Sequence, residues 1–458
     1  MKKMKTNKLF LFTILAAIFA SCESKLEIEP RQRQDASLAL STEKGITDIL
    51  TGTYAILATG DIYGGRTQVS AELLAQTGVT LTTDFRWRGT FAEFRQMYNK
   101  TMVVNNVLVQ SLWARSYEAI NSANIVIDNI GLVKDPVRAK TMIAEAKFIQ
   151  SLVYFDLVRL FAKPFDATVT NSQLGVIIRP KAIYDFNADL SLERSTVDQV
   201  YSLIIAGLNQ AFTDLPANNE FYANKYAAKA LLARVYLQQQ NYEAGLSASN
   251  EVIQMSGTAL SPTYKDAFNH DVNQIEDIFA IQITKQTGDN QVVNHYGSED
   301  VGGRGGDVEI RNTYRNKFTD PNDERRNFNY INADNGRRLT NKYISQFGDV
   351  NIIRLAEMYL IRAECNFRLA STTGATPLAD INLLRTRAKA TNFVIVTLND
   401  ILRERLLELA AEGHAIHDVK RTKGTIGGTY AWNSDKLVFP IPLRETDYNK
   451  KITQNPGY

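Results

Sequence analysis

The sequence predicts a mostly α-helical fold with long irregular loops and a few short strands. Apolar residues recur at spacings of three and four along several segments, which is the periodicity of amphipathic helices. The pattern Leu-Ala-x-x-Tyr occurs from Leu232 to Tyr236 and again from Leu355 to Tyr359, which suits tetratricopeptide-like helical pairs. The chain between the helical segments includes long stretches rich in Gly, Asn and Asp, which indicate loops.

The first residues are typical of a secretion signal. The segment MKKMKTNK carries four lysines and no acid, and an apolar run from Leu9 to Ala20 follows it. This run is too short to span a bilayer, which needs about 20 residues. We therefore predict a signal peptide over residues 1–21.

Cys22 follows the small residues Ala20 and Ser21, and the segment FASC resembles a bacterial lipobox. We expect Cys22 to be lipidated, the alternative being an ordinary signal peptide with a coincidental cysteine. Residues 22–40 are polar and contain a proline, so they are predicted to form an extended, lipidated tether. The acidic Glu23 resembles the export signal of surface lipoproteins in Bacteroidetes-type bacteria, which favours the outer membrane, facing the medium.

Charge and cysteine content exclude several classes of function. Removing the lysines of the leader changes the formal net charge from +3 to about −1, which argues against nucleic acid as a partner. The only cysteine besides Cys22 is Cys365, within a helical pattern. With Cys22 lipidated there is no second thiol, so we expect no disulfide and a buried, hydrophobic Cys365.

Helix signals delimit the expected helices in chain order. Ser41 is a suitable N-cap for the first helix, and Pro136 suits the first turn of a long helix that must end at Lys163-Pro164. The expected helices are 42–58, 117–130, 136–162, 196–214, 223–240, 243–256, 352–370, 377–390 and 398–413.

Two long segments, 59–100 and 257–350, are expected to be irregular. Loops of this length in a compact domain are usually binding surfaces or carry small strands of their own. Short strands are predicted at 277–284 and 436–441.

Several stretches, in the correct order, resemble the SusD/RagB family of outer-membrane lipoproteins. The matching stretches are Trp113–Asn124, AEAKFIQSLVYFDLVRLFAKP at 144–164, Arg354–Glu364, RERLLELAAEGHAIHDVKR at 403–421, and the closing Phe439–Tyr458. The resemblance implies a single SusD-like domain over 41–458, with halves of about 41–256 and 257–458.

The resemblance also implies a function and partners. It implies a lipid-anchored protein that binds a nutrient oligomer, an oligosaccharide or in some members a peptide. The nutrient would pass to a TonB-dependent, SusC-like outer-membrane porin. It implies no enzymatic activity and no cofactor.

The residues themselves give little support to catalysis. His414 and His417 lie three apart on one helical face, as metal ligands do, but satisfied histidines at a helix end are commoner. We expect no metal there and an ion pair between Asp418 and Arg421. No Gly-x-Ser-x-Gly elbow is present. A carboxylate pair of a surface glycoside hydrolase stays an alternative, because its separation is invisible in sequence.

Segment 84–91 has the composition of a ligand platform in a loop. Trp87 lies between Arg86 and Arg88, an unusual setting for a core residue, and Phe91 follows. Aromatic faces beside polar groups suit sugars, whereas peptides use backbone hydrogen bonds. We expect Trp87→Ala to weaken ligand capture strongly and to leave stability nearly unchanged.

The glycine-rich stretch GSEDVGGRGGD at 297–307 is a second candidate for ligand contacts. It carries Arg304, and Tyr296 directly precedes it. Glycines leave such a loop free to close on a ligand, so Tyr296 and Arg304 are candidate binding residues. Trp113, at helical spacing from Tyr117, is expected in the core.

Overall fold

The computed structural model describes residues 39–78, 83–284 and 290–458. Within these ranges the chain forms sixteen α-helices and four two-stranded sheets, so the mostly helical fold is confirmed. The expected signal peptide at 1–21, Cys22 and the tether up to residue 38 lie outside the described residues. In the described part of the chain, no helix is both long and apolar enough to cross a bilayer.

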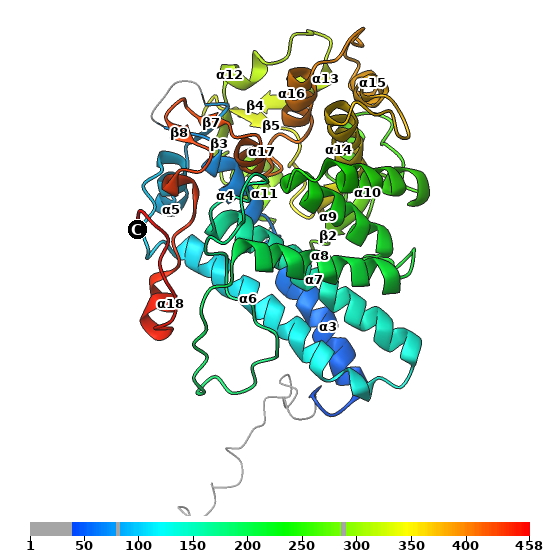
Figure 1. Cartoon of the computed structure of the whole chain (residues 1–458). Helices are drawn as coiled ribbons and strands as arrows, with labels where there is room; N and C mark the ends of the chain where they lie inside the picture. Colours follow the sequence, from blue (N-terminus) through cyan, green and yellow to red (C-terminus); the bar gives the residue numbers. More distant parts are fainter. Residues whose placement is uncertain (1–38, 79–82, 285–289) are drawn as a thin grey trace, which may run out of the picture.

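Long helices packed side by side form the N-terminal half, in the lower part of Figure 1. The helices are α3 (Glu43–Leu57), α6 (Val107–Asp128), α7 (Pro136–Phe161), α8 (Val197–Asp214), α9 (Lys225–Gln238) and α10 (Tyr242–Met255). Polar side chains cap the N-termini of these helices. The side chain of Asn106 accepts hydrogen bonds from two backbone N–H groups of α6, and Thr196 and Gln199 form a capping box at the start of α8. Only α6 departs clearly from the prediction, since it begins at Val107 and not at residue 117.

Helix α7 lies at the centre of this half. Every residue from Phe148 to Phe161 is buried, because α6 and α8 both pack against α7. The close approach of α8 depends on Gly207, where an added Cβ would lie 2.5 Å from the Ser151 Oγ atom. A small residue at this crossing lets the two helix backbones come together.

The C-terminal half continues the paired-helix pattern. The two Leu-Ala-x-x-Tyr motifs lie on α9 and α14, which begin the packed pairs α9–α10 and α14–α15. Helix α14 also packs on α10, where an added Cβ at Gly245 would lie 3.2 Å from the buried Cys365 sulfur. The helices after residue 354 are α14 (Leu355–Arg368), α15 (Pro377–Arg387), α16 (Leu398–Glu408), α17 (Ala415–Arg421) and α18 (Leu443–Tyr448).

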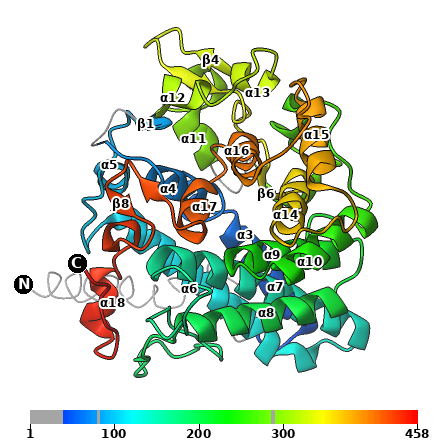
Figure 2. The same cartoon turned by 45° about the horizontal axis from the view of Figure 1, so that its top comes forward.

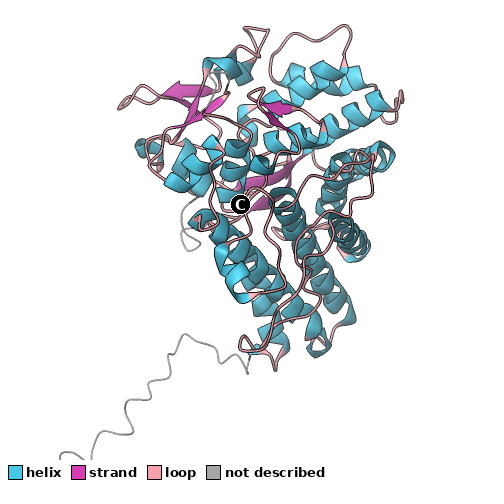
Figure 3. Cartoon of the chain, turned by 60° about the vertical axis from the view of Figure 1, so that its left-hand side comes forward, coloured by secondary structure: helices cyan, strands magenta, loops and turns pink. Residues whose placement is uncertain are grey.

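Short antiparallel strand pairs lie among the helices in the upper and middle parts of Figure 3. The pairs are β1 (Phe85–Trp87) with β3 (Val308–Ile310), β2 (Asp277–Ile281) with β6 (Val350–Arg354), β4 (Asn329–Ile331) with β5 (Arg338–Thr340), and β7 (Thr425–Ile426) with β8 (Tyr430–Ala431). Strand β2 confirms the strand predicted at 277–284.

The strand predicted at 436–441 is wrong. Residues Asp435–Leu437 form a short 3-10 helix, and the chain then runs extended without a strand partner. Pro440 and Pro442 have no N–H to donate to a ladder. The N–H of Phe439 instead donates to the Leu160 carbonyl of α7, at 2.8 Å, which ties the C-terminal segment to the core.

The two segments expected to be irregular contain short elements. Segment 59–100 carries α4 (Arg66–Leu74), β1 and α5 (Ala92–Asn99), and segment 257–350 carries α11 (Gln291–Tyr296), α12 (Asn312–Arg315), α13 (Glu324–Asn327) and β2 to β5. Helix α4 packs against α17, and both lie near the middle of Figure 2. The two segments therefore contribute to the core as well as to the surface.

Candidate ligand-binding site

Strands β1 and β3 bring together the two long segments predicted to bind ligand. Arg86 pairs opposite Glu309, and Trp87 opposite Val308. Because side chains alternate along a strand, Arg86 and Glu309 lie on one face of this small sheet and Trp87 and Val308 on the other. Trp87 and Val308 are buried, whereas Arg86 and Glu309 are partly exposed. The outer face therefore carries charged side chains, and the inner face joins the core.

The indole ring of Trp87 lies inside the protein, which corrects the expectation of an exposed platform in a loop. Only 6% of this residue is exposed. Its ring centroid lies 5.0 Å from that of Phe94 and 5.8 Å from that of His295. Because successive side chains of β1 point to opposite faces, Arg86 points outward where Trp87 points inward.

Phe91 and Arg304 meet at the surface. The guanidinium carbon of Arg304 lies 4.5 Å from the centroid of the half-buried Phe91 ring. Arg304 also donates to the Thr90 hydroxyl at 3.2 Å and lies 3.5 Å from an Asp307 carboxylate oxygen. These contacts hold an aromatic ring and a cation side by side between the two long segments.

A buried histidine supports this surface from below. The Nδ1 atom of His295 lies 2.9 Å from an Asp307 carboxylate oxygen, and the Phe94 ring packs on the imidazole with centroids 4.8 Å apart. Burial lowers the pKa of His295, although Asp307 opposes this shift. The imidazole is therefore uncharged at neutral pH and donates its Nδ1 proton to Asp307.

Tyr296 does not reach the surface. It is the last residue of α11 and is fully buried, with its ring 5.4 Å from that of Tyr343. The predicted position of Tyr296 in a flexible loop is therefore corrected to a helix end inside the core. Arg88, in contrast, is exposed, and its Nε atom donates to Glu309 at 2.8 Å.

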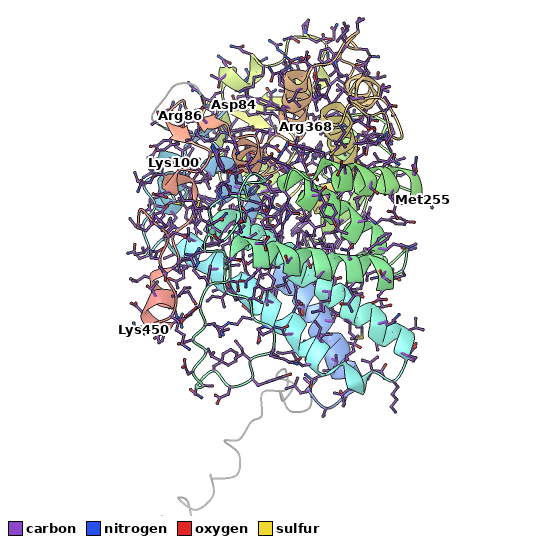
Figure 4. The ribbon with its side chains drawn as sticks, in the orientation of Figure 1. Asp84, Arg86, Lys100, Met255, Arg368 and Lys450 are labelled. Atoms are coloured by element: carbon purple, nitrogen blue, oxygen red, sulfur yellow. The ribbon has the colours of Figure 1, made fainter. Side chains whose placement is uncertain are left out.

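A pocket of about 280 Å³ opens beside β1. Its lining combines two of the predicted residues with others that sequence reasoning missed: Gly78, Thr83, Arg86, Trp87, Arg95, Tyr98, Asn99 and Arg311. Figure 4 shows Arg86 at the edge of the molecule, on the side opposite Met255 of α10. Of the missed residues, Gly78 and Thr83 lie between α4 and β1, Arg95, Tyr98 and Asn99 lie on α5, and Arg311 follows β3.

Two other pockets were not anticipated from the sequence. One, of about 520 Å³, lies between α6 and the segment after α7, with the exposed Phe186 and the buried Trp113 in its lining. Trp113 itself is in the core, as predicted. The other, of about 300 Å³, contains Glu72 and Asp84. Burial raises the pKa of Glu72 to about 7, and Asp84 pairs with Lys317 at 2.9 Å.

His417 lies on α17 (Ala415–Arg421) and is buried, and His414 directly precedes this helix. Burial lowers the pKa of His414 to about 4 and that of His417 well below its usual value. The predicted ion pair between Asp418 and Arg421 is confirmed, at 2.7 Å. Within the described ranges, no group of three or more His, Cys, Asp or Glu side chains is placed to hold a metal ion.

Comparison with protein families gives two matches that together span most of the chain. Residues 26–237 match a family model described as "Starch-binding associating with outer membrane". Residues 263–434 match the model of the SusD family.

Individual relatives agree with these matches. SusD-like protein P25 of Formosa agariphila is 24% identical, covering 99% of this chain and 100% of that protein. Starch-binding protein SusD of Bacteroides thetaiotaomicron is 33% identical over 24% of this chain and 22% of its own length. The crystal structure of a putative sugar binding protein from Bacteroides vulgatus superposes with a TM-score of 0.80 at 25% identity, covering 91% of this chain and 99% of that one.

Proposed function

Because the chain belongs to the SusD/RagB family, we propose that it captures a nutrient glycan and delivers it to a TonB-dependent, SusC-like porin. The family consists of glycan-binding proteins of the outer membrane, and its members bind without catalysing a reaction. The similarity to a starch-binding protein and to a putative sugar binding protein supports a glycan rather than a peptide as the ligand.

The anchoring of the protein is part of this proposal. Cleavage after residue 21 would leave Cys22 to carry lipid, and residues 22–40 would connect it to a single domain over 41–458. An extended chain spans at most about 3.6 Å per residue, so this tether would reach at most roughly 70 Å. That length lets the domain sit over a porin while the lipid stays in the outer leaflet of the membrane.

The observation that carries the proposal is the surface formed by Phe91 and Arg304 beside the pocket of Arg86. Aromatic rings contact the C–H faces of sugars, and guanidinium groups donate to their oxygens. This surface offers the Phe91 ring and the guanidinium groups of Arg304 and Arg86. The pairing of β1 with β3 holds together the two segments that carry these residues. A ligand held by such contacts is released intact, as delivery to a channel requires.

Glycan binding by the purified mature protein tests the proposal. We expect binding to at least one oligosaccharide on a glycan array, without new reducing ends. Arg304→Gln and Phe91→Ala should each weaken this binding by up to about tenfold, because a cation–π or stacking contact contributes roughly 0.5–1.5 kcal/mol.

The matched control is the pair Arg444 and Tyr448 on α18, another cation–π contact, at 5.9 Å. Arg444→Gln and Tyr448→Ala should leave the affinity for the glycan unchanged. Binding to a peptide library but to no glycan would contradict the proposal, as would release of shorter sugars. Isolation of the lipoprotein from outer membranes should recover a large porin with it.

A further inference from the structure

Three arginines line the pocket beside β1, and a fourth lies close to one of them along the chain. Arg86 lies on β1, Arg95 on α5 and Arg311 directly after β3, and all three line the pocket. Arg88 lies two residues after Arg86, on the same face of the sheet. The backbone N–H of Arg311 donates to the Asp84 carbonyl at 2.8 Å, which fixes its position beside β1. We call these residues the arginine face.

Carboxylates neutralise only part of this charge. Glu309 pairs with Arg88 at 2.8 Å and lies 3.8 Å from Arg311. Asp84 is engaged by Lys317. Among the described residues, no carboxylate lies within ion-pair distance of Arg86 or Arg95. The pocket therefore holds an excess of positive charge that a bound anion can neutralise.

The aromatic residues of this pocket offer little surface for stacking. Trp87 and Tyr98 are each only 6% exposed. A neutral sugar would gain little from rings that are covered in this way. Guanidinium groups, in contrast, bind carboxylate and sulfate oxygens through paired, charge-assisted hydrogen bonds. The pocket thus favours recognition of negative charge over recognition of a sugar ring.

We propose that the arginine face binds the anionic groups, carboxylate or sulfate, of an acidic glycan. The inference rests on the proposed function and names the class of its ligand. Arg86 and Arg95 contact the oxyanion directly, and Asn99 is placed to donate to a neighbouring sugar oxygen. Glu309 limits the affinity, because it repels the same groups.

Titration calorimetry of the mature protein with three oligosaccharides of equal length tests the inference. The probes are oligogalacturonate for carboxylate, κ-carrageenan oligosaccharide for sulfate and laminari-oligosaccharide as the neutral sugar. We expect at least one acidic probe to bind about tenfold or more tightly than the neutral one, and to weaken as NaCl rises from about 0.05 to about 0.5 M. The two acidic arms distinguish the two anions.

Neutralising residues of opposite charge should change the affinity for the acidic probe in opposite directions. Arg86→Gln and Arg95→Gln should each weaken binding of the acidic probe about tenfold, whereas Glu309→Gln should strengthen it. A merely structural role of these residues would not produce opposite signs. Arg138→Gln, at an exposed arginine of α7, should change nothing. Melting curves of all variants check that they are folded.

The outcomes separate the inference from the proposed function. Binding of the neutral probe alone, or of acidic probes with no response to these variants, would overturn the arginine face and leave glycan capture intact. Failure to bind any glycan, on the array or in solution, would overturn both.

Discussion

Trp87 packs its indole ring against Phe94 and His295, beneath the surface that carries Phe91 and Arg304. Trp87→Ala should therefore lower the free energy of unfolding by about 3–5 kcal/mol, as truncation of a buried aromatic side chain does. Ligand binding should weaken as well, because the support of the surface is lost. Urea unfolding followed by circular dichroism measures the first effect.

Arg88 on the same segment provides the control for Trp87. Its side chain is exposed, and its ion pair with Glu309 lies at the surface. Arg88→Gln should change the free energy of unfolding by less than about 1 kcal/mol, as expected for a surface ion pair. An unfolding midpoint of Trp87→Ala equal to that of the unaltered protein would show that the ring does not support the fold.

The burial of Trp87 could have been predicted from the residues beside it. Phe85-Arg86-Trp87-Arg88 alternates apolar and charged side chains, which is the period of a half-buried strand. Arg304 could be proposed from its loop alone. Arg311 could not, because it reaches the pocket only through the pairing of β1 with β3, more than two hundred residues apart in sequence. Arg95 reaches the pocket because α5 packs against β1, which the sequence does not show.

At the scale of helices, the crossing of α7 and α8 depends on a small residue. An added Cβ at Gly207 would lie 2.5 Å from Ser151 Oγ, closer than atoms tolerate. Gly207→Ala should therefore destabilise the protein by about 1–3 kcal/mol, the usual cost of overpacking. The Ser151 hydroxyl cannot simply turn away without breaking its hydrogen bond to the Lys147 carbonyl, at 2.8 Å.

A double variant isolates this contact from other effects of the added methyl group. The Ser151 Cβ atom lies 3.9 Å from the added Cβ, an ordinary contact, so Ser151→Ala should restore most of the stability lost in Gly207→Ala. Ser151→Ala alone should have a small effect. Strictly additive free energies of unfolding across the four proteins would contradict a clash at this crossing.

Most of the long helices could be predicted from apolar spacing and an N-terminal signal, such as Pro136 in α7 and Thr196 before α8. Helix α4 could not, since all its residues from Thr67 to Leu74 are buried, including Gln68, Ser70 and Glu72. Buried polar residues on every side remove the periodicity by which a helix is recognised. Tertiary contacts, in this case with α11 and α17, decide the structure of such a segment.

At the scale of the whole molecule, a buried ionic network joins the long segment 257–350 to the C-terminal helices. Arg354, the last residue of β6, contacts Glu276 at 2.7 Å, Glu408 at 3.2 Å and Glu412 at 2.7 Å. Lys342 reaches Glu412 as well, at 2.6 Å. The sequence shows these charges but not their pairing, because the partners lie far apart along the chain.

This network makes stability depend on pH through Glu412. Burial alone would raise the pKa of Glu412. The nearby cations Arg354 and Lys342 outweigh this effect and lower the pKa to about 2, below its ordinary value of 4.5. The ionised carboxylate therefore stabilises the fold fully above about pH 5, and this contribution is lost as the pH falls toward 2. Glu412→Gln should cost about 3–5 kcal/mol at pH 7, because it leaves buried cations unpaired.

The difference between the two proteins should begin to shrink below about pH 4.5, because the Glu412 carboxyl of the unfolded chain then binds a proton while that of the folded protein stays ionised down to about pH 2. Urea unfolding at a series of pH values between about 7 and 3 measures this difference. The matched control is Glu118→Gln, because Glu118 also pairs with an arginine, Arg115, but is 47% exposed. Its effect should be small at every pH. A gap for Glu412→Gln that stays constant with pH would mean that the ionised carboxylate is not what holds Arg354 and Lys342 in the core.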